Sequence, residues 1–181
     1  PVPADWTSVR VDRTLGRVGV PDGLRLDLGA VAKAWTADEA ARRLHQSLGV
    51  PALVAVGGDV AVAGRGPAWP VLVGEIEGED GDVLNLAGGG VATSSTRGRR
   101  WSDGGAERHH VIDPRTGAPT AGPVRTASVL AETCVIANAL STAALVWGDD
   151  ALPRLAGHAA RLVRDDGSVV LTAAWPAEVA A

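Results

Sequence analysis

Two adjacent histidines, His109 and His110, precede the segment Asp113-Pro-Arg-Thr-Gly117 in a chain that has only four histidines. Histidine changes its charge near neutral pH, so it can accept a proton from an attacking hydroxyl group. The same stretch is also typical of a strand that ends in a turn, because Asp-Pro initiates turns and glycine accepts a positive φ. Local residue types leave both interpretations open.

Residues that could bind phosphate occur in three other segments. Lys33 lies at a predicted strand-to-helix junction, where the free N–H groups of a helix start can hold an anion. Gly58 and Asp59 follow a buried strand, and Thr93 and Ser94 lie in a segment rich in glycine and hydroxyl groups that could donate to phosphate. Each segment also has a plainer interpretation: a solvated lysine, a glycine bend and a polar turn.

Two polar residues interrupt the apolar segment 134–148, which is predicted to be a buried helix. Asn138 and Thr142 are four residues apart, so their side chains share one face of that helix. Their oxygens need partners in an apolar environment, and backbone groups, water or a cation could provide them.

Hydrophobic spacing predicts the elements that position these residues. A first helix ends at Gly49 and begins either at a capping box of Thr36 and Glu39 or further back, near Ala30. Short strands are predicted at 24–28, 52–64 with a break at 57–58, 69–78, 82–95 with an interruption at 88–90, 109–112 and 125–131, with a hairpin over 160–175. Paired strands with a few helices indicate an α+β or mixed α/β fold.

Composition narrows the classes of protein. The 181 residues suffice for one domain or slightly more, and with no Phe, Tyr or Met the core must consist of Val, Leu, Ala and six tryptophans. A net charge of −4 without a basic block argues against nucleic acid as a partner. The one cysteine, Cys134, excludes an internal disulfide and is expected to be buried and inert. No apolar run reaches the length of a membrane span.

Five segments together resemble a known family. LDLGAVAKAWTAD, ALVAVGGDV, GVATSS, HHVIDPRTGAP and CVIANALSTAALVWG occur in the order found in the ApbE-like flavin transferases, which are FAD:protein FMN transferases. The family motif His-x-Ile-Asp-Pro-Arg-Thr-Gly is specific, whereas the glycine motifs alone are not. The resemblance covers about residues 24 to 175 and implies an α+β fold of mixed, largely antiparallel sheets packed against a few helices.

The resemblance also implies an activity. Family members bind FAD, hold Mg²⁺ on its phosphates and pass FMN to a threonine hydroxyl of an acceptor protein, with release of AMP. Carried over by position, it assigns the proton step to His110, with His109 as its outward-facing neighbour. It assigns the nucleotide to Lys33, Gly58, Asp59, Thr93, Ser94 and Asp113, and the metal to the Ala30 carbonyl and the side chains of Asn138 and Thr142.

This sequence departs from the family in two respects. Asn138 stands where the family has an aspartate, which removes one negative charge from the metal site. The family also has a long segment ahead of Asp-Leu-Gly that includes residues holding the flavin ring, so residues 1–181 are predicted to be a partial catalytic region without it. Two alternatives to transfer therefore remain: an FAD-binding module without transfer activity, and an FAD pyrophosphatase that yields FMN and AMP. The acceptor protein, the oligomeric state and the cellular compartment are not encoded in any motif.

Overall fold

A six-stranded antiparallel sheet forms the centre of the computed structural model, which describes residues 5–75 and 81–176. Adjacent strands pair in registers that join segments far apart in sequence, such as Thr126 with Ser95. In sheet order the strands are β14 (Val169–Leu171), β13 (Ala159–Arg164), β12 (Val124–Ala131), β7 (Gly89–Ser95), β4 (Asp59–Ala63) and β3 (Ala52–Val56).

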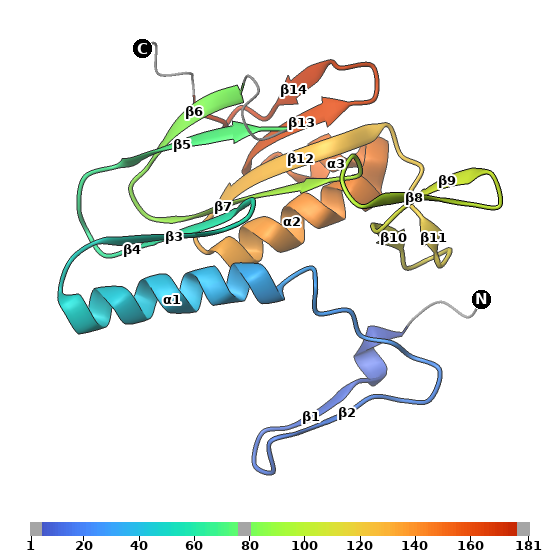
Figure 1. The fold of residues 1–181 in the computed structure, drawn as a ribbon, viewed down its shortest axis with the longest axis horizontal. Helices are drawn as coiled ribbons and strands as arrows, with labels where there is room; N and C mark the ends of the chain where they lie inside the picture. Colours follow the sequence, from blue (N-terminus) through green and yellow to red (C-terminus); the bar gives the residue numbers. More distant parts are fainter. Residues whose placement is uncertain (1–4, 76–80, 177–181) are drawn as a thin grey trace.

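Two helices, α1 (Ala32–Leu48) and α2 (Cys134–Trp147), cover one face of this sheet (Figure 1). The face of α1 that meets the sheet carries alanines with no exposed surface, among them Ala34 and Ala37, and such small side chains let the helix lie close to the strands. Burial also raises the pKa of the Cys134 thiol to about 12, which confirms the prediction of a buried and unreactive cysteine.

A ribbon of two strands, β5 (Trp69–Gly74) and β6 (Gly81–Leu86), covers the other face of the sheet. Side chains alternate along β4, so Ala61 packs toward the helices while Val60 and Val62 pack toward this ribbon. The molecule therefore has three layers, which are the two helices, the sheet and the ribbon, with an apolar cluster on each face of the sheet. Within the described ranges no helix is long and apolar enough to cross a membrane.

Three further ribbons and three short helices lie at the edges of these layers. The hairpin of β1 and β2 has no buried residue and stands apart from the sheet in Figure 1. The ribbons are β1 (Arg10–Asp12) with β2 (Arg17–Gly19), β8 (Arg100–Asp103) with β9 (Ala106–His109), and β10 (Ile112–Asp113) with β11 (Ala118–Pro119). The short helices are η1 (Trp6–Ser8), η2 (Gly148–Asp150) and α3 (Ala151–Arg154).

The α+β prediction is confirmed, as are both long helices and the end of α1 at Gly49, whose φ is 70°. Of the two predicted starts of α1, the one near Ala30 is confirmed, because α1 begins at Ala32. The capping box was wrong, since the Thr36 hydroxyl donates to the Ala32 carbonyl inside the helix. The strand at 24–28 was also wrong. The Asp27 carboxylate accepts a hydrogen bond from the Gly29 N–H at 2.7 Å, which turns the chain there.

Three other strand predictions need correction. Segment 52–64, predicted as one strand broken at 57–58, forms two strands, β3 and β4, that pair as a hairpin across that break. Segment 82–95 also forms two strands, β6 and β7, which belong to different sheets. Strand β9 ends at His109 and β10 starts at Ile112, so 109–112 is not one strand, and part of 69–78 lies outside the described residues.

Gly90 of β7 provides a test of the contact between the sheet and α2. A Cβ there would lie 2.5 Å from the Cys134 backbone nitrogen, whereas a Cβ at Gly88 would meet nothing within 4 Å. We expect Gly90→Ala to lower the free energy of unfolding by about 1–3 kcal/mol in urea denaturation, because the helix must shift. Gly88→Ala is the matched control, and equal destabilisation by both variants would contradict this account.

Candidate functional site

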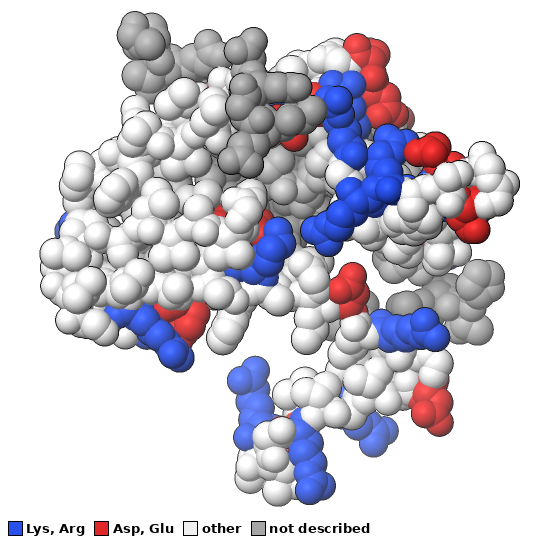
Figure 2. Space-filling view, in the orientation of Figure 1, with Lys and Arg blue, Asp and Glu red and all other residues white. Residues whose placement is uncertain are grey.

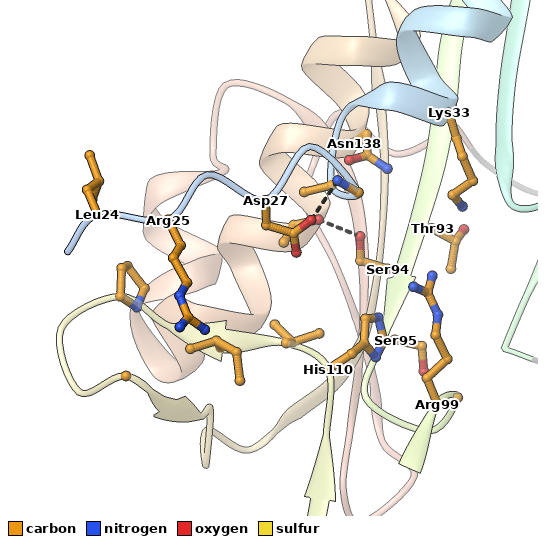
Figure 3. Close-up of a pocket in the computed structure, with 18 of the residues that line it drawn as sticks. Leu24, Arg25, Asp27, Lys33, Thr93, Ser94, Ser95, Arg99, His110 and Asn138 are labelled. Carbon is orange, nitrogen blue, oxygen red and sulfur yellow. Dashed lines mark hydrogen bonds between the residues drawn. The ribbon is translucent and has the colours of Figure 1, made fainter. Parts of the chain in front are cut away.

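A cavity of about 1660 Å³ lies where the start of α1, strand β7, helix α2 and the segment between β9 and β10 meet. Figure 2 shows Lys and Arg side chains gathered along a hollow in this face, and Figure 3 shows labelled side chains from these elements directed toward a common space. The sequence-predicted residues that line it are Ala30, Lys33, Thr93, Ser94, His110, Asn138 and Thr142. Gly58, Asp59 and Asp113 do not line it directly.

A buried carboxylate behind the cavity links strand β4 to helices α1 and α2. Asp59 of β4 is 1% exposed, and its Oδ1 accepts a hydrogen bond of 2.8 Å from the Asn138 amide of α2. Its Oδ2 lies 3.0 Å from Lys33 Nζ of α1, in an orientation that pairs the charges without hydrogen-bond geometry. Asp59 therefore acts behind the cavity wall, through two side chains that do line it.

The hydrogen bond to Asp59 determines how the Asn138 amide is oriented. A carboxylate can only accept from the NH₂ group, so the amide oxygen must point away from Asp59. Asn138 is 6% exposed, and its Oδ1 is a buried acceptor without a hydrogen-bond partner among the described residues. Such an acceptor is costly unless something binds it, which makes Asn138 Oδ1 the strongest candidate for contact with a ligand or cation.

The hydroxyl groups of β7 are held by neighbouring hydroxyls. Thr93 Oγ1 lies 2.8 Å from Ser128 Oγ, and Ser94 Oγ lies 2.8 Å from Ser141 Oγ and 2.9 Å from Thr142 Oγ1. Thr93 and Ser94 therefore lie on a strand, as the prediction for 82–95 had it, and their hydroxyl partners lie on β12 and α2. A hydroxyl can donate once and accept twice, so each retains capacity for a ligand.

The amino end of α1 reaches the cavity without a side-chain cap. Val31 occupies the N-cap position and makes no side-chain capping hydrogen bond. The N–H groups of Val31 and Ala32 donate to the Leu28 carbonyl at 3.1 Å and 2.8 Å, so the N–H groups open to a ligand begin at Lys33. Gly29 and Ala30, directly before this helix, line the cavity. Free N–H groups at a helix start favour anions, and Lys33 in the first turn adds a positive charge.

His110 faces the cavity and is held in its neutral form. Burial lowers the pKa of its imidazole below the usual value, and the charge of Arg99 and then His109 lower it further. The Gly98 backbone and Asp27 oppose the shift. Nδ1 is buried and has no hydrogen-bond partner among the described residues. A neutral imidazole at pH 7 can accept a proton from a hydroxyl group.

His109 and Asp113 hold the turn around His110. His109 is half-buried, with Nε2 2.9 Å from the Thr120 carbonyl, so the expectation of an outward-facing side chain was wrong. Asp113 accepts 2.8 Å and 2.7 Å hydrogen bonds from the Arg115 backbone and guanidinium, which hold its pKa below the usual range. The structure thus places Asp113 in the turn and not on the cavity wall.

Several lining residues had no place in the sequence-based prediction. Arg99 lies in the run Arg97-Gly-Arg-Arg100 between two strands, and this concentration of charge was the signal available for it. Glu75 has no comparable local signal. It lines the cavity because Arg125, fifty positions away, binds its carboxylate at 2.6 Å.

An uncapped helix start, a lysine, ordered hydroxyls and a neutral histidine around one cavity are groups whose chemistry suits a phosphate-bearing ligand. The comparison with known families agrees with this chemistry. The model of the ApbE family matches residues 3–163, and the chain belongs to this family.

Curated relatives share this assignment. The chain is 33% identical over 174 residues to a protein of Rhodobacter capsulatus named FAD:protein FMN transferase, and the match covers 92% of this chain and 33% of the relative. It is 30% identical over 157 residues to a protein of the same name from Escherichia coli K12, covering 83% and 42%. The chain thus spans less than half the length of these relatives.

Solved structures have the same fold. The ApbE protein of Thermotoga maritima superimposes with a TM-score of 0.80 at 30% identity, covering 94% of this chain and 59% of that one. The apo flavinyl transferase ApbE of Pseudomonas stutzeri gives 0.76 at 27% identity, covering 93% and 55%. The resemblance first inferred from the five segments is therefore confirmed at the level of family and fold.

The contact between Asp59 and Asn138 yields a prediction about their exchange. Asn138→Asp removes the amide donor and places a second carboxylate against a buried one, with only Lys33 to offset them. We expect it to lower the free energy of unfolding by about 3–5 kcal/mol, the scale for an uncompensated buried charge. The double variant Asp59→Asn with Asn138→Asp restores a donor and an acceptor, so it should recover much of this loss.

Chemical denaturation of the two single variants and the double variant, without metal or nucleotide, measures the coupling. The exchange would be contradicted if Asn138→Asp were as stable as the unaltered chain. It would also be contradicted if the double variant lost as much free energy of unfolding as the two single variants together.

Proposed function

We propose that this chain provides the phosphate-binding and proton-accepting part of an FAD:protein FMN transferase. The observation that carries the proposal is a neutral His110 facing the same cavity as Lys33 and the uncapped start of α1. Membership of the ApbE family, with relatives named for this activity, supports the choice of FAD as the phosphate-bearing ligand.

FAD binds through its pyrophosphate and adenosine side. The N–H groups at the start of α1, Lys33, and the hydroxyls of Thr93 and Ser94 are the groups that would hold the phosphate oxygens. Gly58 supports this side of the cavity indirectly, because its carbonyl accepts a hydrogen bond of 3.1 Å from the Thr93 N–H.

The reaction is the displacement of AMP by a hydroxyl group. The hydroxyl oxygen of a threonine on an acceptor protein forms a bond to the phosphorus on the FMN side of the pyrophosphate, and the bond from that phosphorus to the AMP oxygen breaks. AMP leaves with the bonding electrons, and the imidazole of His110 accepts the hydroxyl proton. Phosphoryl transfer depends on such positioning and charge neutralisation more than on covalent steps with the protein.

Mg²⁺ would be held by oxygen atoms of three residues. The Ala30 carbonyl, Asn138 Oδ1 and Thr142 Oγ1 are the hard oxygen donors that this ion prefers, and the free acceptor on Asn138 fits this role. No cluster of three or more His, Cys, Asp or Glu side chains suited to a metal occurs in the described ranges, so the phosphates would supply most of the negative charge. Bound there, Mg²⁺ would neutralise charge on the phosphate oxygens.

One observation favours a second function. The neutral Asn138 gives the site less negative charge than an aspartate would, which favours an FAD-binding module without transfer activity. Hydrolysis of FAD to FMN and AMP, with water in place of threonine, is the related alternative reaction.

Incubation of the chain with FAD, Mg²⁺ and a threonine-bearing acceptor peptide distinguishes these functions. We expect the mass of the peptide to increase by one FMN group and AMP to appear in equal amount. The same peptide with the threonine replaced by alanine is the control and should remain unmodified. Free FMN with AMP would identify the pyrophosphatase instead, and FAD binding without either product would identify the binding module.

Replacement of His110 tests the proton step. We expect His110→Ala to lower the transfer rate by about 10²- to 10⁴-fold, with little change in FAD affinity. Because the pKa of His110 is lowered from 6.5, the rate should hold constant near neutral pH and fall only when the pH drops below that value. This acidic decrease should be absent in His110→Ala.

His109→Ala is the matched control. It loses one hydrogen bond to the Thr120 carbonyl, so it should lower stability by about 0.5–1.5 kcal/mol with a much smaller effect on rate. Equal losses of rate at both positions would assign the pair a structural role at a strand end.

A further inference from the structure

We infer that Arg99 forms a second phosphate-binding position in the cavity, on the same side as Lys33. The inference rests on the proposed function only for the identity of the nucleotide. The anion site itself follows from the backbone and side chain of Arg99 and from the charges around them.

The backbone of Arg99 adopts a conformation that residues with a Cβ disfavour. Its φ is 47°, and within 5–75 and 81–176 it is the only residue other than glycine with a positive φ. Such conformations persist where the surrounding structure requires them, and they concentrate at ligand sites. A turn alone could place its positive φ at a glycine such as the neighbouring Gly98, which accepts that conformation without strain. The turn therefore does not explain why the residue with the positive φ is an arginine.

The side chain of Arg99 lies at the cavity with its donors unpaired. Figure 3 shows its guanidinium on the same side of the cavity as Thr93 and the Lys33 ammonium, beside His110. No hydrogen bond or ion pair of Arg99 occurs with the part of the chain that the structure describes. Five donors in a planar fork match the oxygens of a phosphate, which a lysine ammonium can contact only as a point charge.

The adjacent arginines are already paired. Arg97 lies 3.7 Å from a Glu75 carboxylate oxygen, and Arg100 lies 3.7 Å from Glu107. Among the described residues, the run of three arginines therefore contains one without an ion-pair partner, and that one carries the strained backbone. This contrast argues for a specific role of Arg99 and against a general basic surface.

Arg99 also affects the proton acceptor. Its charge, after burial, is the largest influence that lowers the pKa of His110, with His109 acting in the same direction and Asp27 and the Gly98 backbone against it. A phosphate bound at Arg99 offsets this charge, so it raises the affinity of His110 for a proton. The bound nucleotide thereby strengthens the base that the displacement needs.

Pyrophosphate binding to the full chain, measured by calorimetry at fixed ionic strength, tests the inference. Arg99→Gly removes the guanidinium and supplies the residue that accepts a φ of 47°. We expect it to weaken pyrophosphate binding about 10- to 100-fold, the scale of charge-assisted hydrogen bonds, while its melting temperature stays equal or rises. Arg99→Lys should lose part of this affinity, because the fork is absent.

Arg100→Ala is the matched control, since it changes the net charge equally one residue away. It should alter pyrophosphate affinity by less than about 3-fold, because it acts only through screened, longer-range charge. Equal losses at both positions, undetectable binding to the unaltered chain, or unchanged affinity in Arg99→Gly would each overturn the inference. The assay contains no flavin or acceptor, so its outcome is independent of whether FMN transfer is observed.

Discussion

The buried carboxylate of Asp59 is the group on which the geometry of the site depends. A carboxylate with 1% exposure must be paired, and the partners of Asp59 come from α1 and α2. These contacts hold the two helices close to the start of β4. Lys33 supplies the opposite charge and the Asn138 amide supplies a hydrogen bond. In satisfying Asp59, these two side chains become fixed in the wall of the cavity, one as a cation and one as an outward-facing acceptor.

Close packing of small residues makes this arrangement sterically feasible. The contact between the two helices and the sheet consists of residues such as Ala37, Ala61 and Ala92, which are almost fully buried. The same closeness lets Asp38 of α1 accept hydrogen bonds of 2.9 Å and 3.0 Å from the first N–H groups of α2. A core without phenylalanine, tyrosine or methionine thus brings polar groups of three elements within hydrogen-bonding distance.

The electrostatics of the cavity follow from the same architecture. Positive charge comes from the start of α1 and from the arginine-rich segment after β7, whereas the histidine between them is kept neutral by burial and by that positive field. The cavity therefore combines positive charge, which attracts anions, with an imidazole whose pKa is lowered. This combination suits displacement at a phosphate, where charge must be neutralised while a hydroxyl proton is removed.

The sequence by itself determined the local features of this protein. Apolar spacing specified both long helices, and Gly49 specified the end of α1. Most of the motif residues, including His110 and Ser94, line the cavity, whereas Gly58, Asp59 and Asp113 do not. Tertiary structure decided what those residues do, since the hydrogen bond between Asp59 and Asn138 joins positions 79 residues apart. Periodicity and turn chemistry act over a few residues, whereas strand pairing, the partner of a buried charge and a strained φ depend on which distant segments the folded chain brings together.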